Sequence, residues 1–193
     1  MSVIWSGFRR LADFSGRDRR GRFWPYALVV AVLVYVGLML AMIPTMATMF
    51  GEAARYAAEN PDQTTVVAGP GYYSVQIHDP DAALMPDFAP FFWAVRVAVI
   101  AAGVLLAAAV TRRLHDTGRA GWWGLPPLVL LAGVSAIFPS VVEGMMQEAD
   151  PSLAGFFLMF GLGVLYNLSL IGLAVLLCLK GTTGTNRYGP EPG

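Results

Sequence analysis

The residues best suited to chemistry lie in one polar run between two apolar stretches, Arg112-Arg-Leu-His-Asp-Thr-Gly-Arg-Ala-Gly-Trp-Trp123. Arginine presents a planar fork of donors that matches phosphate oxygens, and the glycines permit a tight turn. We therefore interpret the run as a candidate site for a phosphate or a lipid headgroup, with contacts from Arg112, Arg113, His115, Asp116 and Arg119. One alternative is a basic anchor at the membrane surface. Another is catalysis through His115 and Asp116.

Two further polar residues fall inside apolar stretches. An arginine at a bilayer centre costs about 2.5–3.5 kcal/mol on insertion scales, and Arg96 lies well inside its stretch. Its guanidinium can extend back to the membrane surface, because helical side chains lean toward the helix N-terminus. Alternatively, Arg96 faces the interior of a helix bundle and pairs with a carboxylate or with Asn167.

Enzyme templates match the chain poorly. Its two histidines, His78 and His115, are expected on opposite sides of the membrane, and Cys178 is the single cysteine. A zinc site needs three or four ligands close together, and neither a Gly-x-Ser-x-Gly motif nor a P-loop occurs in the sequence. We therefore expect no catalytic residue, no metal and no cofactor.

Four apolar stretches must position these residues. They cover roughly residues 23–50, 88–110, 122–142 and 153–179. Hydrophobic residues make up 56% of the chain and charged residues 13%, against about 25% charged in ordinary globular chains. A bilayer core about 30 Å thick needs ~20 apolar residues of helix. The sequence predicts an all-α membrane protein with a four-transmembrane-helix bundle.

Charge segregation predicts the orientation of that bundle. The 13 Lys and Arg residues lie before the first stretch, between the second and the third, or after the fourth, with two exceptions, Arg55 and Arg96. Short cytoplasmic segments are enriched in Lys and Arg, so we expect both termini in the cytoplasm. The chain then divides into a basic segment 1–22 and a membrane domain 23–193, with an outer loop 51–87 and a cytoplasmic tail 180–193. Interfacial anchors are Trp24, Trp122 and Trp123.

Local patterns add four expectations. Residues 4–12 read as a short helix in the membrane interface, with a disordered basic arm as the alternative. The first helix can project beyond the membrane until Asn60-Pro61 stops it. Two β-prone runs, residues 64–67 and 72–77, predict a small hairpin in the outer loop. The regular helix of the third span should begin near Leu125.

The basic segments are expected to meet on one side of the membrane. The tail offers hydrogen-bonding groups beside a cation, Asn186 and Arg187, and the first segment offers Arg17 and Arg20. We count these four among the candidate contacts to headgroups or a partner. We also expect residues 181–192 to contact Arg112–Arg119, with a disordered tail as the alternative.

Three ordered motifs carry a family resemblance. They are Phe14-Ser-Gly-Arg17 followed by Arg20 and Phe23-Trp24, the run Arg112–Trp123, and Gly181-Thr-Thr-Gly-Thr-Asn-Arg-Tyr-Gly-Pro-Glu-Pro192. Together they resemble the bacterial inner-membrane family catalogued as domain of unknown function 805, the YhaH-like proteins. The resemblance covers nearly the whole chain except the outer loop, which is longer than is usual for the family. It implies a multi-pass protein of the bacterial inner membrane and implies no activity.

Three functional hypotheses follow. The first is a non-enzymatic membrane protein whose basic cytoplasmic face engages anionic lipid headgroups or a protein partner, and no nucleic acid. The second is a subunit of a small transporter or channel with a polar path touching Arg96, Asn167 and Arg113, which would require a homo-oligomer. The third is a membrane enzyme that acts on lipid phosphates.

Overall fold

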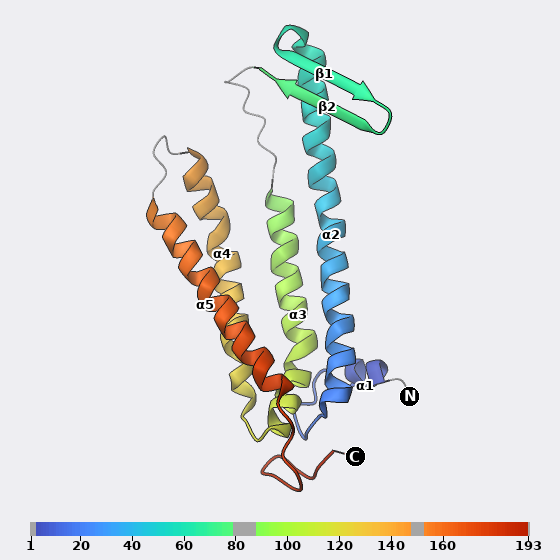
Figure 1. Cartoon of the computed structure of the whole chain (residues 1–193), viewed down its shortest axis with the longest axis vertical. Helices are drawn as coiled ribbons and strands as arrows, with labels where there is room; N and C mark the ends of the chain where they lie inside the picture. Colours follow the sequence, from blue (N-terminus) through green and yellow to red (C-terminus); the bar gives the residue numbers. More distant parts are fainter. Residues whose placement is uncertain (1–2, 79–87, 148–152, 193) are drawn as a thin grey trace. The chain divides into compact units, whose positions relative to one another are not determined.

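The computed structural model describes residues 3–78, 88–147 and 153–192. Their order is α1 (Val3–Arg9), α2 (Arg20–Glu59), η1 (Pro61–Gln63), β1 (Thr64–Gly69), β2 (Tyr72–Ile77), α3 (Ala89–Asp116), η2 (Gly121–Gly124), α4 (Leu125–Gln147) and α5 (Leu153–Cys178) (Figure 1). The described part of the chain is therefore helical, with one two-stranded sheet.

Four of these helices are long and apolar enough to cross a membrane: α2, α3, the stretch from Gly121 to Val142, and α5. The structure thus contains four candidate membrane-spanning helices, as expected. The predicted short helix within residues 4–12 is present as α1. The predicted start of the third span at Leu125 and the predicted stop of the first helix at Asn60-Pro61 agree with the bounds of α4 and α2.

Helix α3 is longer than the apolar stretch that predicted it. The stretch ends near residue 110, and α3 continues to Asp116. Cations are favourable in the last turn of a helix, where the free carbonyls carry partial negative charge. Arg112, Arg113 and His115 therefore extend the helix beyond its apolar part rather than ending it.

Contacts divide the chain into two compact units, residues 1–37 with 95–193, and residues 38–94. The second unit contains the C-terminal part of α2 and the hairpin. There β1 and β2 pair antiparallel around Pro70-Gly71, so the predicted hairpin is confirmed. The Thr64 hydroxyl donates to the carbonyl of Asn60 at 3.0 Å, which ties β1 to the end of α2. The predicted loop residues 79–87 lie outside the described residues.

The first unit has a small core at the end that carries the arginines. Phe23, Tyr26 and Val30 of α2 pack there against α3 and α5, through Ala109, Leu114 and Leu177. Helix α1 lies against the first turns of α2 (Figure 1), where the Phe8 ring meets Tyr26 edge-on at 5.2 Å. Most other large apolar side chains of the helices are exposed, as expected for surfaces that face lipid. The core therefore supports the polar end of the unit.

Candidate functional site

The end of α3 is shaped by a glycine cap. Gly118 has φ +76°, a backbone conformation that glycine adopts without steric cost. The Arg119 N–H donates to the Leu114 carbonyl at 2.9 Å, and the Gly118 N–H donates to the His115 carbonyl at 3.0 Å. This pair of bonds is the Schellman motif. It ends the helix directly after Asp116 and turns the chain toward η2.

Arg112 connects this helix end to the N-terminal segment. Its Nε donates to the Asp18 carboxylate at 2.6 Å, and its Nη1 donates to the carbonyls of Arg10 and Asp13. The Asp18 N–H donates to the Arg112 carbonyl at 3.1 Å. Arg22 adds a longer contact to Asp18 at 3.5 Å. Arg112 thus holds residues 10–18 against α3.

Asp116 connects the same helix end to the other two segments. Its Oδ1 accepts from the Arg17 Nε at 3.1 Å and forms an ion pair with the Arg17 Nη2 at 3.0 Å. Its Oδ2 accepts from Arg113. Arg113 also donates to the carbonyls of Leu177 and Leu179 at the end of α5. Those carbonyls lack intrahelical donors, so Arg113 caps α5.

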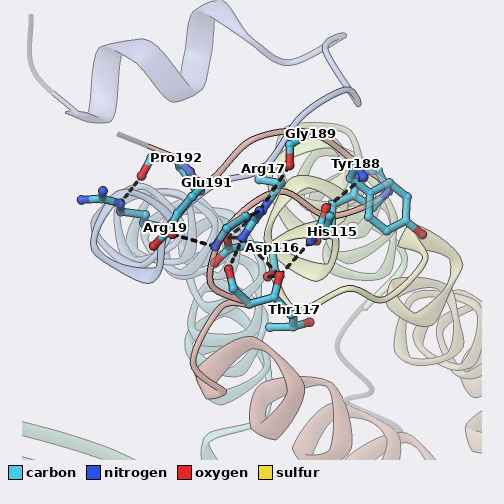
Figure 2. Close-up of polar contacts among 12 residues, drawn as sticks. Arg17, Arg19, His115, Asp116, Thr117, Tyr188, Gly189, Glu191 and Pro192 are labelled. Carbon is cyan, nitrogen blue, oxygen red and sulfur yellow. Dashed lines mark hydrogen bonds and ion pairs between the residues drawn. The ribbon is translucent and has the colours of Figure 1, made fainter.

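Arg17 then organises the tail. Its Nη1 donates to the carbonyls of Gly184 at 2.7 Å and Gly189 at 3.3 Å, and its Nη2 donates to Thr182. Figure 2 shows Arg17 between Asp116 and the tail residue Gly189. One arginine therefore folds a segment of eight residues onto the end of α3.

These five charged residues are almost completely removed from solvent. Their exposed fractions are 5% for Arg17, 3% for Asp18, 1% for Arg112, 0% for Arg113 and 4% for Asp116. Buried ion pairs of this kind are stable only when further hydrogen bonds satisfy the remaining donors, and the backbone carbonyls supply those here. We call these residues the buried ionic cluster.

The tail completes the site through close packing. The Asn186 amide donates to the His115 carbonyl at 3.0 Å, and the Thr182 N–H donates to the Asp116 carbonyl at 2.9 Å. The Tyr188 ring stacks on the His115 ring at 3.7 Å. A Cβ added at Gly181 would overlap the Asp116 carboxylate, so only glycine fits there. The predicted contact between the tail and residues 112–119 is present.

The adjacent His115 and Asp116 do not act together in this structure. The Asp116 carboxylate accepts from Arg17 and Arg113, whereas the His115 Nδ1 lies 3.2 Å from the Gly16 carbonyl. A carbonyl only accepts, so Nδ1 carries the proton. The arrangement positions segments and is not that of a general acid–base pair. No group of three potential metal ligands occurs among the described residues.

The remaining candidate residues lie in different surroundings. Arg20 is exposed, and Arg119 is partly buried. Arg187 is exposed and donates to the Gly118 carbonyl at 3.2 Å. Arg96 is partly buried on α3. The exposed Asn167 donates to the Gly163 carbonyl of its own helix at 2.8 Å.

The expected anchor residues are all at the surface of the first unit. Trp24, Trp122 and Trp123 are 40%, 58% and 45% exposed. The rings of Trp122 and Trp123 stack at 4.6 Å in η2. Their exposure suits side chains at a membrane interface.

Sequence reasoning missed Asp18, the second carboxylate of the buried ionic cluster, and the stacking of Tyr188 on His115. A signal for Asp18 was available, because it is the acidic residue within the basic run Arg17–Arg22. A lone carboxylate among arginines is well placed for pairing. No comparable signal marks the stacking of Tyr188, because it depends on which ring the tail brings against Tyr188.

Comparison with known proteins agrees with the resemblance in the motifs. A family model described as "Protein of unknown function (DUF805)" matches residues 11–190, and the chain belongs to this family. It is 33% identical over 88 residues to "Uncharacterized protein YiiR" of Escherichia coli, in strains K12 and O157:H7, which covers 44% of this chain and 51% of each relative. The chain thus spans about half the length of these curated relatives. No solved structure matches it.

Proposed function

We propose that this member of the DUF805 family is a non-enzymatic, multi-pass protein of the bacterial inner membrane whose basic end engages anionic lipid headgroups. Both termini lie in the cytoplasm in this proposal, because basic segments stay on that side. A reporter fused after residue 193 tests the orientation. A fused alkaline phosphatase should be inactive and a fused green fluorescent protein should fluoresce, and the opposite pattern would contradict the proposal.

The observation that carries the proposal is the division of the cations into two groups. The arginines of the buried ionic cluster donate hydrogen bonds to acceptors within the protein. A second group remains at the surface of the same end, and we call it the basic rim: Arg9, Arg19, Arg20, Arg22, Lys180 and Arg187. Lys and Arg near an anionic membrane surface each contribute about 1 kcal/mol of attraction. The rim is therefore the part that can meet headgroups.

An apolar groove supports lipid over a soluble anion. It has a volume of about 480 Å³ and lies between α3, α4 and α5. Leu128 and Tyr166 are among its lining residues. Thr111 and Trp122 also line it, and Thr111 directly precedes the arginines of α3. Such a surface suits an acyl chain whose headgroup lies at the level of the basic rim.

The experiment changes rim residues and substitutes no member of the buried ionic cluster. Arg22 has a 3.5 Å contact to Asp18, which remains paired with Arg112 and Arg10. The triple variant Arg9→Gln, Arg22→Gln, Arg187→Gln should lose about 3 kcal/mol of preference for phosphatidylglycerol over phosphatidylcholine, roughly a hundredfold. Native mass spectrometry of the detergent-solubilised protein with both lipids measures that preference. The control Arg55→Gln, on the outer part of α2, should retain it. Equal preference in the triple variant and the wild type would contradict the proposal.

A further inference from the structure

A polar pocket opens between the start of α2, the end of α5 and the tail. Its volume is about 290 Å³, near the lower end of the ~300–1,000 Å³ range of small-molecule sites. Its walls come from three separated parts of the chain, among them Arg20 and Gly21, Arg113 with Asp116, and Lys180. The pocket is therefore a product of the folded unit, and it is distinct from the apolar groove.

The charges that line this pocket do not balance. Arg19, Arg20, Arg113 and Lys180 face two carboxylates, those of Asp116 and Glu191. Asp116 is neutralised by Arg113 and Arg17 at the floor of the pocket, and Glu191 accepts from the Gly184 N–H at 2.9 Å. The side chains of Arg20 and Lys180 have no hydrogen bond or ion pair to the described residues. Two cations thus remain available to an anion.

The backbone adds donors at the same place. The Arg19 carbonyl accepts from the N–H groups of Arg22 and Phe23, both at 3.0 Å, so α2 begins at Arg20. The N–H groups of Arg20 and Gly21 belong to the first turn and have no intrahelical partner. The start of a long helix also carries partial positive charge. Gly21 lines the pocket, and a Cβ added there would meet nothing within 4 Å.

We propose that this pocket binds a phosphate-bearing anion. Arg20, Lys180 and the first N–H groups of α2 would donate to the phosphate oxygens. Guanidinium, ammonium and helix N-terminal donors together are the recurrent chemistry of phosphate recognition. The proposal rests on the proposed function, since it gives the basic rim one specific headgroup site. A lipid phosphodiester and free phosphate both present anionic, non-bridging phosphate oxygens, and the test distinguishes these two ligands.

The sharpest test places a competing carboxylate in the pocket. Gly21→Glu should place a carboxylate at the wall of the pocket. We expect the fold to be kept, because an added Cβ meets nothing within 4 Å and the helix start favours a negative charge. Gly21→Gln has the same shape without the charge. Full-length protein in neutral detergent is titrated with phosphatidylglycerol and, separately, with inorganic phosphate at constant ionic strength. Native mass spectrometry counts the bound ligand.

We expect Gly21→Glu to weaken binding of at least one probe about tenfold or more, and Gly21→Gln to stay within about threefold of the wild type. A charge-matched pair supplies the second comparison. The double variant Arg20→Gln, Lys180→Gln should lose more affinity than Arg9→Gln, Arg187→Gln, although both remove two cations from the basic rim. Binding of phosphatidylglycerol alone identifies a lipid headgroup. Binding of inorganic phosphate as well identifies a site for free phosphate.

Two results would overturn the proposal that this pocket binds a phosphate-bearing anion. One is equal binding by the two Gly21 variants, and the other is an equal loss in the two double variants. If either occurs while the rim triple variant still loses its lipid preference, the pocket fails and the proposed function stands. If the wild type has no preference for phosphatidylglycerol but binds inorganic phosphate in a manner that Gly21→Glu abolishes, the proposed function fails and the pocket stands.

Discussion

Neutralising Asp116 should open the tail while keeping the shape of the site. In Asp116→Asn the side chain keeps its volume and one acceptor oxygen, but the guanidiniums of Arg17 and Arg113 lose their shared counter-ion. Both side chains are almost fully buried, at 1% and 0% exposure. Removing one partner from a buried ion pair costs about 3–5 kcal/mol, because it leaves a buried charge uncompensated.

That cost should appear mainly in the docking of the tail, since Arg17 connects Asp116 to the carbonyls of Thr182, Gly184 and Gly189. A loss of 3–5 kcal/mol raises the undocked population by roughly 10²- to 5 × 10³-fold. When opening is fast relative to cleavage, proteolysis follows that population. Limited trypsin digestion of the detergent-solubilised protein, with cleavage after Arg187 followed by intact mass, therefore measures the effect.

Asp13→Asn is the matched control for Asp116→Asn. Asp13 pairs with one arginine, Arg10, at 2.9 Å, and its side chain is 37% exposed. Exposed pairs contribute about 0–1 kcal/mol, so the control should change the cleavage rate by about fivefold at most. Equal cleavage rates in Asp116→Asn and the wild type would refute our account of the buried ionic cluster.

Two further perturbations test the N-terminal segment. Gly7→Ala should release α1 from α2, because a Cβ at Gly7 would overlap the Tyr26 ring. Faster trypsin cleavage after Arg9 measures the release. A cleavage rate equal to that of the wild type would contradict the packing of α1 on Tyr26. The Ser15 hydroxyl, and then Arg10, hold the pKa of Asp13 at about 2, below its usual 3.8. The stability from this contact is then present above the unfolded pKa and lost as the pH falls through about 2. An NMR titration should find the low pKa and its rise toward 3.8 in Ser15→Ala; a pKa of 3.8 in the wild type would exclude the contact.

Much of the architecture could be read from local patterns. The long apolar runs predicted the four spanning helices, because helix length and bilayer thickness are tied by the rise per residue. Asn60-Pro61 predicted the end of α2, and residues 64–67 and 72–77 predicted the hairpin. Hydrophobicity alone does not mark the end of α3, because the helix continues from the apolar stretch through the arginines to Asp116. The cap at Gly118 ends it instead.

The sequence by itself determined which end of the chain's helices would be basic and that three motifs would gather there. Only the tertiary structure decided which arginines are buried and which stay at the surface. Arg17 and Asp116 are 99 residues apart, and no periodicity encodes a contact at that distance. Arg20 and Arg112 count equally in any charge pattern, yet Arg20 is exposed and Arg112 is buried, with 1% of its surface exposed. The difference arises because a guanidinium is buried only where carboxylates and free carbonyls converge on it, and that convergence is set by the packing of α2, α3, α5 and the tail.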